Sequence, residues 1–303
     1  MSENHNLSGN GTNQSWQTRR EEAVAGGVST LLPAFIQKAR NAELWDIEGN
    51  RYIDFAAGIA VLNTGHNHPK VIAAVQEQLT RFTHPCFQVT PYPEYIELAE
   101  RLNALVPIKE ATQTLLLTTG AEAVENAVKV ARIATGRGGV IAFRGGFHGR
   151  TLMGMALTGK VAPYKQGYGP FPSGIYHAPY PAPYLGITEQ HALDALDAIF
   201  AADIAPTEVA AIIIEPVQGE GGFYAAPAGF LKSLREICDR HGIVLIADEI
   251  QSGFCRTGKT FAIEHTGVEP DLVTMAKSLA GGFPLSALVG KKRLMEKALP
   301  GGL

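Results

Sequence analysis

The sequence has few cysteines, little net charge and no long apolar run, and each of these absences excludes a class of protein. The three cysteines, Cys86, Cys238 and Cys255, are too few and too widely spaced for a disulfide framework or a zinc knuckle. A net charge of −3 offers no electrostatic attraction for nucleic acid or an anionic membrane. No apolar run approaches the roughly 18 residues that a membrane helix needs.

The N-terminal residues also lack the apolar core of a secretory signal. Residues 1–20 are polar, so we expect a polar N-terminal arm and a cytoplasmic protein. The whole chain is 46% hydrophobic and 18% charged, which is the composition of a globular protein. A length of 303 residues predicts one large domain together with smaller pieces.

Short apolar runs alternate with helical patterns along most of the chain. Residues 41–55 predict a β-hairpin around an EGN turn. Further strands are expected at 114–119, 139–143, 209–216, 243–249, 271–278 and 285–290, and helices at 68–82, 93–105, 121–134, 189–202 and 228–242. This alternation predicts an α/β fold with a mostly parallel mixed sheet and helices on both faces. Ligands of such sheets bind at the carboxyl ends of the strands.

Three polar features lie where predicted strands end, and each has a structural interpretation beside a functional one. Gly120 begins either an ordinary turn or a helix whose free N–H groups, from Ala121 onward, bind an anion. Asp248 either caps a loop or pairs with a buried cation, and Glu249 is a rival for that role. Lys277 either extends its ammonium to solvent or, when desolvated, attacks a carbonyl and forms a Schiff base.

Taken together, these features match the three chemical handles of pyridoxal 5′-phosphate. The N–H groups suit its phosphate, the carboxylate suits its ring nitrogen and the amine suits its aldehyde. We therefore expect pyridoxal phosphate as the cofactor. No metal is expected, because His66 and His68 have no third ligand placed near them.

Seven stretches in one order carry a resemblance to a known family: DFAAGIAVLNTGHNHP, TGAEAVENAVKVAR, FHGRT, IIIEPVQGEGG, ADEIQSGFCRTGK, MAKSLAGGFPLSALVG and the final PGGL. The chain resembles the class III aminotransferases of the fold-type I pyridoxal-phosphate enzymes, and within them the bacterial 4-aminobutyrate aminotransferases. The resemblance implies the large domain of that fold at residues 67–303 and part of a small domain at residues 21–66, after the arm at residues 1–20.

The resemblance also implies roles for individual residues. Lys277 would bind the cofactor and later move a proton, and Asp248 would pair with the ring nitrogen. Arg150 would bind the substrate carboxylate through its planar guanidinium, although a surface ion pair is the plainer interpretation. The other residues implied to contact cofactor or substrate are Gly120 and Ala121 at the phosphate, Phe147 on the ring face, Gln251 at the ring oxygen, Ile59 along the substrate chain and Glu220 as a gate.

The implied reaction is ping-pong transamination of 4-aminobutyrate with 2-oxoglutarate, giving succinate semialdehyde and glutamate. 5-Aminovalerate is expected as a further substrate, because one methylene changes discrimination by only about 1–3 kcal/mol. Acetylornithine or another ω-amine is the alternative substrate. Two hypotheses of a different class stay open at this point: an aminomutase or racemase on the same fold, and a non-catalytic binding protein.

The resemblance further implies a homodimer or a dimer of dimers whose partners are small amines and 2-oxo acids, without nucleic acid or membrane. Relatives place a gate arginine and a threonine that reaches the neighbouring subunit beyond the position of Leu303. We therefore expect the 303-residue chain by itself to be a weakly active or inactive fragment. Its last residues would lie in a large domain that is incomplete at the C-terminus.

Overall fold

The computed structural model describes residues 11–303, and these residues fall into two compact units divided between Thr83 and His84. This boundary lies after Thr83, whereas the sequence predicts a domain boundary after residue 66. Residues 1–10 of the expected polar arm lie outside the described residues. None of the helices within residues 11–303 has both the length and the apolar character needed to cross a membrane.

The first unit contains helices around a small antiparallel sheet of order β1-β2-β3. Within the predicted polar arm, residues 13–20 belong to a helix that Thr12 caps by accepting a hydrogen bond from the Ser15 N–H at 3.2 Å. The expected hairpin is present as β2 and β3. The elements of this unit are α1 (Asn13–Ala23), β1 (Ile36–Arg40), β2 (Glu43–Asp46), β3 (Arg51–Ile53), α2 (Ala57–Ala60) and α3 (Pro69–Leu79).

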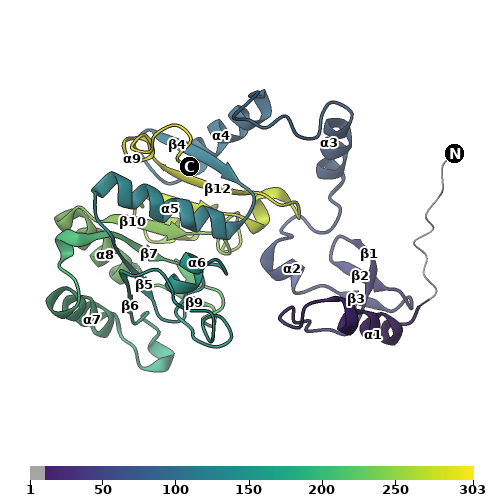
Figure 1. Ribbon diagram of the computed structural model, residues 1–303, viewed down its shortest axis with the longest axis horizontal. Helices are drawn as coiled ribbons and strands as arrows, with labels where there is room; N and C mark the ends of the chain where they lie inside the picture. The colour runs from purple at the N-terminus through teal and green to yellow at the C-terminus, as the bar shows by residue number, and fades with distance from the viewer. Residues whose placement is uncertain (1–10) are drawn as a thin grey trace. The chain divides into compact units, whose positions relative to one another are not determined.

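The second unit is built on a seven-stranded sheet of order β4-β12-β11-β10-β7-β5-β6 (Figure 1). Strand β12 runs antiparallel to both neighbours, and the other pairs are parallel. The strands are β4 (Thr112–Leu117), β5 (Gly139–Phe143), β6 (Ile175–Ala178), β7 (Val209–Ile214), β10 (Val244–Asp248), β11 (Leu272–Met275) and β12 (Ser286–Lys291), with β8 (Val217–Gln218) and β9 (Tyr224–Ala225) forming a separate hairpin.

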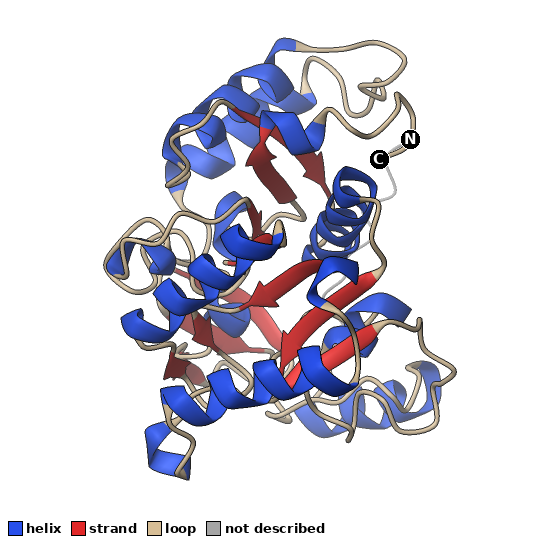
Figure 2. Ribbon diagram, turned by 90° about the vertical axis from the view of Figure 1, so that its left-hand side faces the viewer, coloured by secondary structure: helices blue, strands red, loops and turns tan. Residues whose placement is uncertain are grey.

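Helices cover both faces of this sheet, and Figure 2 shows the strands in red between them. Successive residues of each buried strand point to opposite faces. One face packs on α4, α7 and α8, and the other packs on α5, α6 and α9. These helices are α4 (Pro93–Leu105), α5 (Gly120–Thr135), α6 (Leu152–Leu157), α7 (Glu189–Ala202), α8 (Ala228–His241) and α9 (Lys292–Met295), with 3₁₀ turns at Pro183–Leu185, Pro206–Glu208, Ala262–His265 and Lys277–Ala280.

The predicted α/β class and the mostly parallel mixed sheet are confirmed, with two differences of detail. The strand expected at 271–278 ends at Met275, because its pairing with β10 stops at Thr274 and its pairing with β12 stops at Met275. Lys277 instead opens the 3₁₀ turn Lys277–Ala280. Strand β6 was not predicted, and it extends the sheet at the edge beyond β5.

Candidate active site

The predicted anion site is the amino end of α5, where the chain leaves β4. Thr119 caps the helix, and the Glu122 carboxylate accepts hydrogen bonds from the Thr118 N–H at 3.2 Å and the Thr119 N–H at 2.7 Å. The first intrahelical hydrogen bond is donated by the Ala123 N–H to the Thr119 carbonyl. The N–H groups of Gly120 and Ala121 therefore precede the helical hydrogen-bond pattern and are available to an anion.

Two other loops pack tightly against this turn. A Cβ atom on Gly120 would lie 3.0 Å from Cδ1 of Ile250, in the loop that follows β10. A Cβ atom on Gly149 would lie 2.9 Å from Cβ of Ala121, and Gly149 has a φ of +115° that side-chain-bearing residues rarely adopt. The close approach brings the segments that carry Phe147, Asp248 and the α5 amino end to one place.

Asp248 is the last residue of β10, and its buried carboxylate is held from three directions. Oδ2 accepts a hydrogen bond from Nδ1 of His148 at 2.7 Å. Oδ1 accepts from the Thr274 hydroxyl at 3.0 Å and from the Ile250 N–H at 3.2 Å. Only 3% of Asp248 is exposed, so these donors compensate much of the cost of burying the charge. The carboxylate is therefore fixed at the carboxyl end of the sheet.

His148 is the partner that gives Asp248 a counter-charge. Burial disfavours the imidazolium, but the hydrogen bond to Asp248 and the charges of Asp248 and Glu215 together outweigh it and raise the pKa of His148 above its ordinary value. The backbone N–H of His148 also donates to the Thr158 hydroxyl at 3.1 Å, and this bond fixes the loop that carries the ring. His148 was given no role from the sequence, so the structure adds it to the site.

Glu249, the rival of Asp248, is directed into a different part of the molecule. Its carboxylate accepts hydrogen bonds from the Ala262 N–H at 3.1 Å, the Ile263 N–H at 2.8 Å and the Ser252 hydroxyl. These bonds hold the 3₁₀ turn Ala262–His265 against the end of β10. Glu249 therefore has a structural role, and Asp248 is the carboxylate of the candidate site.

Lys277 follows β11, the strand beside β10, and it has an unusual backbone conformation. Its φ is +46°, in the left-handed region that non-glycine residues occupy rarely and usually under local constraint. Burial lowers the pKa of Lys277 below its ordinary value, although the nearby carboxylates of Asp248, Glu215 and Glu220 act in the opposite direction. A desolvated amine of lowered pKa beside these acids is a candidate nucleophile.

The surroundings of three other predicted residues, Gln251, Phe147 and Arg150, differ in how many neighbouring groups contact them. A Cβ atom on Gly219 would overlap the Gln251 amide, so Gln251 lies directly on the turn that precedes Glu220. Phe147 is half-buried, and its ring lies 5.1 Å from the ring of Tyr164. Arg150 is exposed, without a hydrogen bond or ion pair to any residue of the described part of the chain.

Ile59 belongs to the first unit, and the structure does not relate it to the other candidate residues. Its side chain is 59% exposed, and its φ is +61°, which is rare for a β-branched residue. Its predicted role beside the substrate stays a prediction.

Two further residues of the site, His148 and Glu215, were missed from the sequence. Glu215 follows β7 directly and accepts hydrogen bonds from the Phe147 N–H at 2.8 Å and the Gly219 N–H at 3.2 Å. Burial raises its pKa to about 7. The available signal was that Glu215, like Asp248, is a carboxylate at the end of a continuous apolar run.

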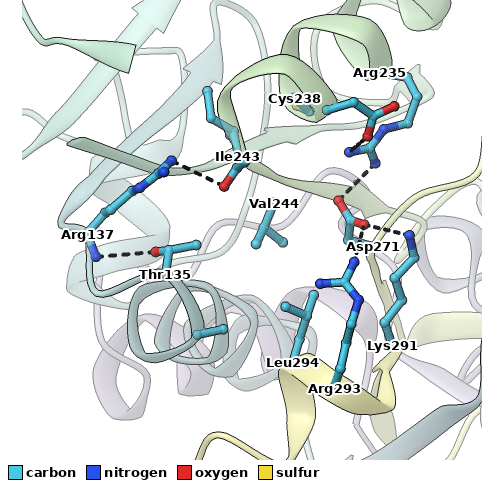
Figure 3. A pocket seen from close by; sticks show the side chains of 13 residues that line it. Thr135, Arg137, Arg235, Cys238, Ile243, Val244, Asp271, Lys291, Arg293 and Leu294 are labelled. Atoms are coloured by element: carbon cyan, nitrogen blue, oxygen red, sulfur yellow. Dashed lines mark hydrogen bonds and ion pairs between the residues drawn. The ribbon is translucent and has the colours of Figure 1, made fainter. Parts of the chain in front are cut away.

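A cavity of about 430 Å³ lies at the amino ends of β10 and β11, opposite the carboxyl ends that carry the candidate site (Figure 3). The charged groups that line it already form ion pairs and hydrogen bonds with neighbouring groups. Asp271 pairs with Arg235 at 2.8 Å and with Lys291 at 2.9 Å, and Arg137 donates to the carbonyl groups of His241 and Gly242. Because these cations already face carboxylates and helix carbonyls, the cavity is not a candidate anion site.

Comparison with known proteins identifies the class of protein that this fold and site define. The family model for aminotransferase class III matches residues 24–303. The chain belongs to the class III aminotransferase family, which confirms the resemblance noted in the sequence.

Individual relatives agree with this assignment. The chain is 57% identical to a 5-aminovalerate aminotransferase of Pseudomonas putida and 55% identical to a 4-aminobutyrate aminotransferase of Escherichia coli, in each case over 96% of its own length. A taurine:2-oxoglutarate aminotransferase of Bifidobacterium kashiwanohense, solved with pyridoxal phosphate and glutamate, is similar over 95% of the chain, with a TM-score of 0.86 and 28% identity. The chain spans 69%, 68% and 67% of the lengths of these three proteins.

Proposed function

We propose that the protein transfers the amino group of 4-aminobutyrate, and also of 5-aminovalerate, to 2-oxoglutarate. The support is the family membership together with the names of the two relatives at 57% and 55% identity. The products are succinate semialdehyde, or the corresponding five-carbon semialdehyde, and glutamate. The two amino acids differ by one methylene, a difference that an apolar pocket discriminates by only about 1–3 kcal/mol.

The residues of the site fit pyridoxal phosphate, the cofactor of the family. The Gly120 and Ala121 N–H groups at the α5 amino end suit the phosphate. The Asp248 carboxylate, held by His148 and Thr274, suits a protonated ring nitrogen. Lys277 supplies a desolvated amine for the aldehyde. We assign Phe147 to the ring face and Gln251 to the ring oxygen.

The chemistry divides between the cofactor and the residues of the chain. When bound, pyridoxal phosphate supplies an aldehyde that takes up the amino group and a ring that withdraws electrons from the adjacent carbon. Lys277, whose pKa is lowered by burial, removes and returns the proton at the carbon that bears the nitrogen. Asp248 keeps the ring nitrogen protonated, and His148 keeps the Asp248 carboxylate in place.

Two further residues are assigned to the substrate. Arg150 binds a substrate carboxylate, because its guanidinium is exposed and makes no ion pair with the described residues. We assign Glu220 to the choice between the two amino donors. An ω-amino acid has no carboxylate beside its amine, whereas glutamate has one, and the negative charge of Glu220 would oppose that carboxylate. The exposed Glu220 carboxylate acts electrostatically on Lys277, and it therefore lies within range of the reacting amine.

The observation that carries the proposal is the position of Lys277 and Asp248 after and at the carboxyl ends of adjacent strands. Asp248 pairs in register with Thr274, three residues before Lys277. One aspartate anchored by donors and one desolvated lysine at the ends of neighbouring strands place a ring nitrogen and an aldehyde on the same edge of the sheet.

The test is the visible absorption spectrum of the purified protein with pyridoxal phosphate, before and after addition of 4-aminobutyrate. We expect a band of the lysine-bound cofactor in the wild type that disappears when the amine is added. Lys277→Ala should lack the band, whereas Lys232→Ala, an exposed lysine on α8, should keep it. A wild-type protein without a band, both as this chain and when extended to the length of its relatives, would refute the proposal. A response to acetylornithine alone would keep the reaction class and change the substrate.

A further inference from the structure

Glu215 joins two segments of the candidate site through one carboxylate. Its Oε1 accepts a hydrogen bond from the Phe147 N–H at 2.8 Å, and its Oε2 accepts one from the Gly219 N–H at 3.2 Å. The same segments meet again where Nε2 of Gln218 donates to the Arg144 carbonyl at 2.9 Å. Residues 144–149 carry the ring-stacking Phe147 and are called the ring segment here. Residues 216–221 carry Glu220 and are called the gate segment.

We propose that Glu215 is a positioning residue that fixes the ring segment and the gate segment in one arrangement. This inference rests on the proposed function for what the two segments do, but the joint itself is a property of the chain. Through it, the face of the cofactor ring and the group that distinguishes the two substrates are set together. Glu215 acts through Phe147 and Gly219 and touches neither cofactor nor substrate in this role.

The joint depends on the charge state of the carboxylate. An ionised carboxylate accepts hydrogen bonds at both oxygens, whereas a protonated one carries a hydroxyl donor on one oxygen. That hydroxyl faces an N–H donor, so one of the two segments loses its bond. Burial raises the pKa of Glu215 to about 7, which brings this change into the neutral range. While Glu215 stays buried, the two hydrogen bonds of the joint should therefore strengthen as the pH rises through about 7, although the same ionisation lowers the free energy of global unfolding.

The charged and titratable groups around Glu215 come from several elements. His148, on the ring segment, favours the ionised form of Glu215, and Asp248, at the end of β10, disfavours it. Lys277 lies within electrostatic range after β11. The Tyr180 hydroxyl donates to the backbone carbonyl of Glu215 at 3.1 Å, and burial raises the pKa of Tyr180, so it stays neutral.

Glu249 provides a matched control. It is fully buried, and it also accepts two backbone N–H groups, those of Ala262 and Ile263. Burial raises its pKa as it does for Glu215. Glu249 differs in the segment that it holds, because its bonds join neither the ring segment nor the gate segment. Glu215→Gln and Glu249→Gln therefore remove equivalent charges from different places.

The first measurement is amide hydrogen exchange of the chain without cofactor at about pH 6 and about pH 8, corrected for the intrinsic rate. We expect Glu215→Gln to raise exchange about tenfold in at least one of the two segments, because the amide oxygen still accepts one N–H group while the amide NH2 group faces the other. Glu249→Gln should leave both segments unchanged and raise exchange at residues 261–264. In the wild type, protection of at least one of the two segments should fall toward the lower pH, and Glu215→Gln should remove this dependence.

Two outcomes would overturn the inference. One is a folded Glu215→Gln protein in which both segments keep wild-type protection. The other is wild-type protection that does not change with pH in both segments, a comparison that needs no variant and decides the matter if Glu215→Gln does not fold. Because these measurements use neither cofactor nor substrate, they stand even if no absorption band forms and the proposed function fails.

The second measurement separates positioning from a purely structural role. The ratio of kcat/KM for 4-aminobutyrate to that for glutamate reports how Glu220 is placed. Glu215→Gln should change this ratio at least about threefold and remove its pH dependence near neutrality. A ratio equal to that of the wild type at both pH values would show that Glu215 only satisfies buried N–H groups, and the positioning role would be rejected.

Discussion

Two buried aspartates lie at opposite ends of the adjacent strands β10 and β11, and the groups that contact their carboxylates differ. Asp248 ends β10 and is 3% exposed, and Asp271 precedes β11 and is 4% exposed. Asp271 is neutralised by Arg235 and Lys291, and it also accepts the Leu245 N–H at 2.8 Å. Asp248 has His148 and neutral donors but no Lys or Arg in contact among the described residues.

This difference separates Asp271, whose charge is neutralised within the fold, from Asp248, to which we assign a functional role. The cations around Asp271 outweigh the effect of its burial and hold the pKa of its carboxyl below the ordinary value. Asp248 is positioned by its donors and is still able to receive a further cation, which suits a ring nitrogen. Burial alone would not have separated them, because both are almost fully enclosed. The partners at the two ends of the strands make the distinction.

The largest expected effect comes from Asp248→Asn. A neutral amide cannot hold a ring cation, so we expect kcat/KM for 4-aminobutyrate to fall about a thousandfold or more, which is roughly 4 kcal/mol of transition-state stabilisation. The midpoint of denaturant unfolding should change less than for Asp271→Asn. An Asp248→Asn variant with near wild-type turnover would contradict the functional role assigned to Asp248.

Asp271→Asn should have the largest effect on stability. The substitution leaves Arg235 and Lys291 beside an uncharged group in a half-buried site, and breaking such a pair costs about 3–5 kcal/mol in unfolding free energy. Lys292→Ala is the control, because the exposed Lys292–Glu296 pair should contribute less than about 1 kcal/mol. Chemical denaturation measures both. Equal effects of the two substitutions would contradict the structural assignment of Asp271.

The contributions of Asp271 and Glu215, at opposite ends of the strands, to the free energy of unfolding should change with pH in opposite directions. The lowered pKa of Asp271 stabilises the folded state above its ordinary value of 3.8, and this contribution is lost as the pH falls. The pKa of Glu215, raised from 4.5 to about 7, stabilises the folded state below 4.5, and this contribution is lost as the pH rises to about 7.

Unfolding free energies of wild type and variants at several pH values test these signs. The difference between wild type and Asp271→Asn should shrink below about pH 4. Between about pH 5 and pH 7, wild type should lose roughly 2 kcal/mol of unfolding free energy relative to Glu215→Gln. A shift in the same direction at both ends of the strands would show that one of the two pKa assignments is wrong.

The sequence predicted those parts of the site that lie at the ends of strongly patterned elements. Asp248 and Lys277 follow apolar runs, and Gly120 stands between a strand and a helix, so each could be located from local pattern alone. His148 and Glu215 could not be assigned in this way. His148 meets Asp248 across 100 positions of the chain, and Glu215 meets Phe147 across 68. Such contacts depend on which strands become neighbours.

The sequence also could not decide which of the adjacent carboxylates, Asp248 or Glu249, belongs to the candidate site. Consecutive strand residues point to opposite faces, so the sequence established that the two carboxylates would separate. It did not establish which face would carry the site. That followed from the neighbours: His148 and Thr274 lie on one side, and the turn Ala262–His265 lies on the other.

The sequence by itself determined the α/β class, most strand and helix positions, the family and the candidate lysine and aspartate. Apolar periodicity and strand-end residues are local properties, and seven ordered motifs suffice for a family. Only the tertiary structure decided which polar groups share a hydrogen bond, which acids keep a raised or lowered pKa and which loops are joined by Glu215. Those properties arise from desolvation and from contacts between distant segments, and neither exists until the sheet has assembled.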